Sequence, residues 1–136
     1  MARATLRFYE ELNDFLPAKC GIKTRFVDIS DIDSVAAAVN ERTRLIFTES
    51  VSNPTLRVAD IPRIAGIASQ HGIPLVVDNT FSPLVLRPAV LGADIVVHSI
   101  TKFISGASDI IAGAICADKS FILELMDLHL GSLMLL

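Results

Sequence analysis

Short apolar runs alternate along this chain with stretches in which apolar residues recur every three or four positions. The first pattern predicts β-strands, and the second predicts amphipathic helices. We expect strands at residues 24–29, 44–47, 75–77, 95–98 and 110–117. Strands that alternate with helices are typical of a parallel sheet covered by helices on both faces. The predicted fold class is therefore α/β, with a mainly parallel sheet flanked by helices.

Three helices are expected among these strands. Asp31 and Asp60 are suitable N-caps for the first two, and Pro62 fits the first turn of the second. Asp118 would begin the last helix, and a short helical turn is expected at residues 89–91.

Polar residues follow two neighbouring apolar runs directly. Asp78 ends one run, and Ser99, Thr101 and Lys102 follow the next. In an open parallel sheet, ligands bind just beyond the carboxyl ends of the strands, so an acid and a lysine would face one pocket. Pyridoxal 5′-phosphate (PLP) requires this pair, because a lysine forms the Schiff base and an acid keeps the pyridine nitrogen protonated.

Two of these residues also have simpler interpretations. Lys102 is flanked by Thr101 and Phe103 rather than by other charges. A lysine in apolar company loses hydration, and its neutral amine can attack an aldehyde. The alternative is a surface lysine whose stem packs along apolar groups. Asp78 could hold a pyridinium, or it could cap the next turn through the backbone amides of Asn79 or Thr80.

Three further polar residues could contribute to the same site. If the chain stays extended, the hydroxyls of Ser99 and Thr101 point the same way and could seat a phosphate. Otherwise they are ordinary strand-end hydroxyls. Asn53 follows another predicted strand and could donate a hydrogen bond to a phenolate-type oxygen, or form an Asx-turn before Pro54.

Composition limits the classes of protein to consider. The 136 residues allow at most one domain, 51% of them are hydrophobic, and only 20% are charged. Small domains expose proportionally more surface, so a mean hydropathy of +0.54 predicts faces that meet further chain or a partner subunit. The net charge of −3 argues against nucleic-acid binding, and no apolar run is long enough for a membrane span.

Cysteine and histidine positions give no sign of a metal site. Cys20 and Cys116 lack metal-ligand spacing and are too few for a disulfide framework, so we expect buried free thiols in a reducing compartment. His71, His98 and His129 share no ligand-like spacing and are interpreted as structural.

Four segments occur in a fixed order: Glu49-Ser-x-x-Asn53-Pro54, Val77-Asp78-Asn79-Thr80-Phe81, residues 91–103, and Ser105-Gly106 with Asp109. This set resembles the Cys/Met-metabolism family of PLP-dependent enzymes, which has the aspartate aminotransferase-like fold (fold type I). The family includes cystathionine γ-lyase, β-lyase and γ-synthase, methionine γ-lyase and O-acetylhomoserine sulfhydrylase. Residues 103–113 and 126–136 look most like the plant-type methionine γ-lyases of that family.

The resemblance implies a role for each candidate. Lys102 would carry PLP and move protons, and Asp78 would pair with the pyridine nitrogen. Ser99 and Thr101 would hold the phosphate, and Asn53 would contact the ring 3′-oxygen. The implied activity is a PLP-dependent carbon–sulfur lyase that converts methionine to methanethiol, 2-oxobutanoate and ammonia. The implied enzyme is cytoplasmic, a homotetramer of dimers with shared active sites.

The match begins near residue 21. Residues 1–20 match poorly, and Tyr9 does not fall in the family's Tyr-Gly-x-Thr motif. Residues 21–136 are therefore expected to be part of the PLP-binding large domain, without activity alone. Other members of the family are alternative identities, and an inactive α/β interaction module is an alternative of another class.

Overall fold

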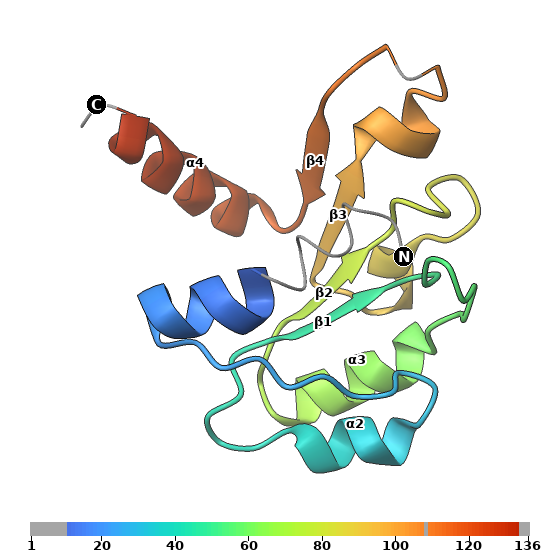
Figure 1. The fold of residues 1–136 in the computed structure, drawn as a ribbon, viewed down its shortest axis with the longest axis vertical. Helices are drawn as coiled ribbons and strands as arrows, with labels where there is room; N and C mark the ends of the chain where they lie inside the picture. Colours follow the sequence, from blue (N-terminus) through green and yellow to red (C-terminus); the bar gives the residue numbers. More distant parts are fainter. Residues whose placement is uncertain (1–10, 108, 134–136) are drawn as a thin grey trace.

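Four strands form one sheet in the computed structural model, which describes residues 11–107 and 109–133 (Figure 1). They stand in the order β1-β2-β3-β4. β1, β2 and β3 are parallel, and β4 is antiparallel to β3. The strands are β1 (Ile46–Glu49), β2 (Leu75–Asp78), β3 (Ile95–Ser99) and β4 (Gly113–Cys116). The predicted mainly parallel α/β sheet is confirmed.

The helices begin where the capping residues predict. Asp31 accepts a hydrogen bond from the Ser34 backbone N–H at 3.2 Å and begins α2 (Ile32–Ala38). Asp60 does the same with the Arg63 N–H at 3.3 Å at the start of α3 (Ile61–Gln70). Each carboxylate satisfies one of the backbone donors that a helix start leaves without a partner.

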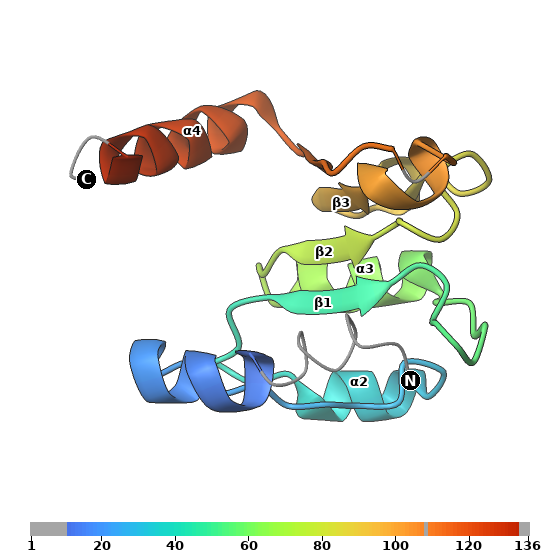
Figure 2. The ribbon, with the colours of Figure 1, turned by 45° about the horizontal axis from the view of Figure 1, so that its top comes forward.

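The remaining helical segments are α4 and three shorter ones. α4 (Lys119–Leu133) follows Asp118, which accepts the Ser120 backbone N–H at 3.0 Å. In Figures 1 and 2, α4 extends away from the sheet. The other three are η1 (Glu11–Cys20), η2 (Pro88–Leu91) and η3 (Ile100–Ile104).

Two expected strands differ from the observed chain. Residues 24–29 form no strand, and their Phe26 and Val27 side chains are exposed rather than packed in a sheet. The last strand is shorter than expected and runs antiparallel. Parallel neighbours require a crossover, usually a helix, and the described residues between β3 and β4 contain only the turn η3 and a loop.

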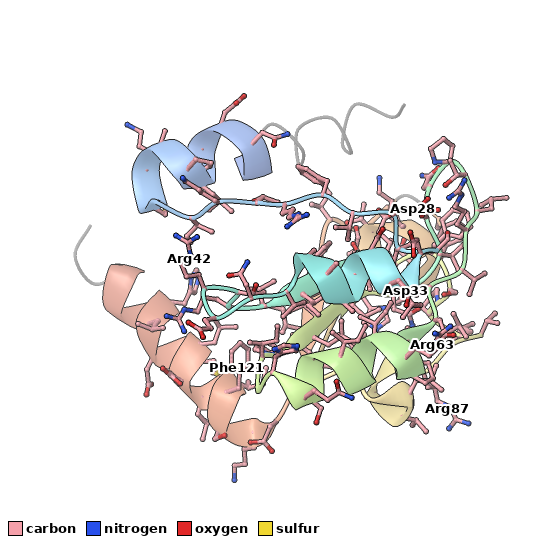
Figure 3. All side chains as sticks on the ribbon, turned by 90° about the horizontal axis from the view of Figure 1, so that it is seen from below. Asp28, Asp33, Arg42, Arg63, Arg87 and Phe121 are labelled. Atoms are coloured by element: carbon pink, nitrogen blue, oxygen red, sulfur yellow. The ribbon has the colours of Figure 1, made fainter. Side chains whose placement is uncertain are left out.

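The hydrophobic core lies between α3 and one face of the sheet. Six of its buried residues are Ile61, Ile64 and Ala68 from α3, Leu75 and Val77 from β2, and Val96 from β3. Full burial of each large aliphatic side chain contributes about 1.5–3 kcal/mol. Figure 3 views the molecule from the side of the sheet that the helices cover, with α2 and α3 next to each other. The exposed side chain of Asp33 lies on α2, and that of Arg63 lies on α3.

The opposite face of the sheet is less covered. Alternation along the strands places Phe47 and Ile115 there, and these side chains are 37% and 48% exposed. We expected helices on both faces, whereas α2 and α3 share one.

Candidate active site

The carboxyl ends of the parallel strands bring two predicted residues together. In the ladders, Glu49 is opposite Asp78 and Asp78 is opposite Val97. Ser99 lies two positions beyond Val97, so its side chain is on the same face as Asp78. This is the face opposite α3, because Val77 and Val96 point into the core.

Asp78 is partly buried at the end of β2. Its Oδ1 accepts a hydrogen bond from the Thr80 backbone N–H at 2.8 Å. The turn-capping interpretation of Asp78 is therefore observed. It does not exclude a ligand, because a carboxylate has a second oxygen with its own lone pairs.

Ser99 and Thr101 do not alternate in extended geometry as expected. β3 ends at Ser99, and Thr101 lies in the turn η3. The Thr101 hydroxyl donates to the Ala112 carbonyl at 3.2 Å and accepts from the Ala112 N–H at 3.0 Å. It therefore joins the end of β3 to the segment before β4.

Lys102 also lies in η3, and its side chain is exposed rather than enclosed by apolar groups. The backbone leaves helical geometry at this residue, with φ −91° and ψ −110°. The ring of the next residue, Phe103, meets Phe81 edge to face with centroids 5.0 Å apart. The lysine thus lies in the turn that follows β3, and this turn contacts the segment after β2.

Asn53 is exposed in the loop after β1. Its backbone N–H donates to Glu49 Oε2 at 3.3 Å, which connects the loop to the strand end. Arg57 in the same loop pairs with Asp28, which precedes α2, at 3.0 Å, but both side chains are 56% exposed. Such a pair contributes about 0–1 kcal/mol.

Two side chains at this edge had no role in the sequence prediction. The Thr80 Oγ1 atom accepts a hydrogen bond from the Ser99 backbone N–H at 2.8 Å. Glu49 lies beside Asp78, and burial raises the pKa of the Glu49 carboxyl. The Asn53 N–H opposes that shift of the pKa, and the nearby Asp78 charge adds to it. An acid two positions after the apolar run 45–47 was the available signal for Glu49.

Replacing Glu49 with glutamine is expected to reduce the pH dependence of the free energy of unfolding. A carboxyl whose pKa is higher in the folded state stabilises that state at low pH. That contribution is lost as pH rises from the ordinary value of 4.5 through the raised pKa. Glutamine removes the titration, and its amide oxygen can still accept the Asn53 N–H.

Urea unfolding at a series of pH values measures this effect, with Glu41→Gln as the control because Glu41 is exposed. Wild-type and Glu49→Gln profiles that stay parallel above pH 4.5 would contradict the prediction.

The sheet edge offers the groups that PLP needs. A carboxylate suits a pyridinium nitrogen, a serine hydroxyl suits a phosphate oxygen, and an exposed lysine amine is available to an aldehyde. Asp78, Ser99 and Lys102 supply these groups from the ends of two adjacent strands. The chemistry of this donor set fits PLP.

The cysteines and histidines lie outside this set. Cys20 and Cys116 are free thiols, but both are exposed, so the prediction that they are buried is wrong. The Nδ1 atom of His98 is buried and has no hydrogen-bond partner in the described part of the chain. Across residues 11–107 and 109–133, no group of three acidic, histidine or cysteine side chains could hold a metal ion.

Comparisons with known proteins match nearly the whole chain. The model of the family described as "Cys/Met metabolism PLP-dependent enzyme" matches residues 5–134. Methionine gamma-lyase of Arabidopsis thaliana is 59% identical over 126 residues, covering 92% of this chain and 29% of that protein. L-methionine gamma-lyase of Pseudomonas putida is 46% identical over 103 residues, covering 75% of this chain and 26% of that protein.

A solved structure agrees with these matches. The putative O-acetylhomoserine (thiol)-lyase of Campylobacter jejuni superposes with a TM-score of 0.77 at 38% identity. The match covers 82% of this chain and 26% of that one, and the Campylobacter protein is described as carrying N′-pyridoxyl-lysine-5′-monophosphate. The chain thus spans between about a quarter and a third of the length of the relatives it matches.

Proposed function

Because the chain belongs to the Cys/Met-metabolism family of PLP-dependent enzymes, we propose that it forms the middle of the PLP-binding domain of a larger carbon–sulfur lyase. We call that larger protein the parent enzyme. One observation carries the proposal: Asp78 and Ser99 share one sheet face, and Lys102 lies three positions after Ser99, in the turn η3. A larger enzyme is supported by the relatives, because the matched region covers only 29% of the Arabidopsis protein and 26% of the Campylobacter protein.

Each residue has a proposed task at this edge. Lys102 carries PLP and moves protons between its amine and the substrate, while Asp78 holds the ring-nitrogen proton. Ser99 binds the phosphate, and Asn53 contacts the ring 3′-oxygen. When bound, PLP supplies an electron sink for the bonds around the substrate α-carbon.

Thr101 is proposed as a second phosphate ligand, but its hydroxyl already has a hydrogen-bond partner in the structure. Its single hydroxyl proton is donated to the Ala112 carbonyl at 3.2 Å. Binding of phosphate by this hydroxyl therefore requires that bond to be exchanged for one to a phosphate oxygen.

The proposed substrate is a sulfur amino acid, with methionine favoured by the 59% identity to Arabidopsis methionine gamma-lyase. Cystathionine is the competing substrate, since a probable cystathionine gamma-synthase of Herpetosiphon aurantiacus is 46% identical over 105 residues. We also propose a cytoplasmic enzyme, supported by the free thiols, and a homotetramer of dimers, supported by the exposed apolar sheet face. None of the described helices is long and apolar enough to cross a membrane.

The parent enzyme is expected to release methanethiol and 2-oxobutanoate from methionine faster than it acts on cystathionine or cysteine. The 136-residue chain alone is expected to show no turnover, because catalytic groups that act as a unit lose activity together when some are missing. Thiol and 2-oxo acid assays on both proteins measure these results.

If the parent enzyme turns over cystathionine faster than methionine, it has another activity of the same family. A parent enzyme that neither binds PLP nor turns over any of the three amino acids would favour the inactive interaction module. Turnover by the chain alone that Lys102→Ala abolishes would show that the short chain is itself an enzyme.

A further inference from the structure

Thr80 lies just beyond β2, between the acid and the serine of the proposed site, and is partly buried. Its backbone N–H donates to Asp78 Oδ1 at 2.8 Å. Its side-chain Oγ1 accepts the Ser99 backbone N–H, also at 2.8 Å. One residue therefore contacts the strand ends that carry both Asp78 and Ser99.

The bond to Ser99 occurs where the β2–β3 ladder stops. The last regular step is the Asn79 N–H donating to the Val97 carbonyl at 2.9 Å. The next donor along β3 on this side is the Ser99 N–H, but the chain bends away at Thr80. The threonine hydroxyl takes the place of a backbone carbonyl, and without it a partly buried N–H would lose its acceptor.

The bend at Thr80 is held by the side chain of the preceding residue, Asn79, which is 1% exposed. Asn79 Nδ2 donates to the Leu86 carbonyl at 3.0 Å, and Asn79 Oδ1 accepts the Ser82 hydroxyl at 2.8 Å. Ser82 in turn meets the Ser50 hydroxyl at 3.0 Å, next to the end of β1. This buried network fixes the backbone from which the Thr80 hydroxyl projects.

We propose that Thr80 is a positioning residue that holds Asp78 and Ser99 at a fixed separation, so that one ligand engages both. The inference rests on the proposed function, in which Asp78 meets the ring nitrogen and Ser99 meets the phosphate. PLP carries the nitrogen in its ring and the phosphate on a short arm attached to that ring, so the distance between the two groups is limited and their partners must be correctly spaced before the ligand arrives. Thr80 itself does not take part in the reaction.

Three substitutions in the parent enzyme test the proposal. Thr80→Val removes the hydroxyl and keeps the shape, Thr80→Ala removes it without a bulky replacement, and Thr80→Ser retains it. Thr43→Val is the matched control, because the Thr43 hydroxyl also accepts a backbone N–H, from Asn40 at 2.9 Å. Thr43 precedes β1 and so lies at the other end of the sheet from the proposed site.

Two measurements apply to every variant: hydrogen exchange at the Ser99 amide without cofactor, and the dissociation constant for PLP by absorbance. In Thr80→Val and Thr80→Ala we expect exchange at Ser99 to become about tenfold faster and PLP to bind about tenfold more weakly. We expect Thr80→Ser to restore both values and Thr43→Val to change neither. If Thr80→Val does not fold, Thr80→Ala decides the result.

Faster exchange at Ser99 with unchanged PLP affinity would show a purely structural threonine and overturn the inference. Unchanged exchange would overturn it too, because the hydroxyl would then not hold the Ser99 amide. If wild-type parent enzyme binds no PLP, the proposed function fails and the inference fails with it. The wild-type measurement thus separates failure of the function from failure of the inference.

Discussion

Lys102→Ala is expected to abolish covalent attachment of PLP and to lower kcat of the parent enzyme by a factor on the order of 1,000 or more. The lysine follows the end of β3 directly, and its side chain is exposed. Alanine leaves no amine at this position. Borohydride reduction followed by peptide mass spectrometry is expected to find the pyridoxyl group on Lys102 of the wild-type enzyme and nowhere in the variant.

Lys119→Ala is the matched control for this experiment. Lys119 begins α4 and is also exposed, but it follows β4 rather than the polar end of β3. We expect this variant to keep both the label and the activity. A pyridoxyl group on Lys119, or on no lysine, would contradict the assignment of Lys102.

Asp78→Asn is expected to lower kcat by a factor of roughly 100 or more, as when an electrostatic stabiliser of developing charge is removed. Asparagine resembles aspartate in shape, and its amide oxygen can still accept the Thr80 N–H that Asp78 Oδ1 accepts at 2.8 Å. The substitution therefore removes the charge and retains the turn cap. Steady-state kinetics and thermal unfolding together separate the two roles.

Asp31→Asn serves as the control, because Asp31 also accepts a backbone N–H, from Ser34, but caps α2 far along the chain from the site. Its kcat is expected to stay near that of the wild type. Near-normal turnover by Asp78→Asn would show that Asp78 is only a turn cap.

Features with local causes were predictable from the sequence. Asp31 and Asp60 begin helices because their carboxylates satisfy nearby backbone N–H groups, and this chemistry involves residues only three positions apart. The direction of β4 was not predictable in this way, because it depends on how the chain returns after β3. Residues 24–29 have a strand-like composition, but a strand also requires a neighbour with which to pair.

The same distinction applies to the site. The grouping of Asp78 and Ser99 on one face was predictable, because strand ends that carry polar residues meet at one edge of a parallel sheet. The position of Thr101 was not, because β3 ends two residues earlier and the chain enters a turn. The contact of the Thr80 hydroxyl with Ser99 was also unpredictable, since it depends on a bend that the buried side chain of Asn79 holds in place.

The two faces of the sheet have different environments. Val77 points toward α3 and is 0% exposed, while the next residue, Asp78, lies on the opposite face beside Glu49. Successive residues of one strand thus serve different purposes: one secures the fold, and its neighbour faces the proposed cofactor site. A substitution at Asp78 is therefore expected to alter the proposed cofactor site while the packing of Val77 against α3 stays intact. A fold arranged in this way can acquire new substrates without rebuilding its core.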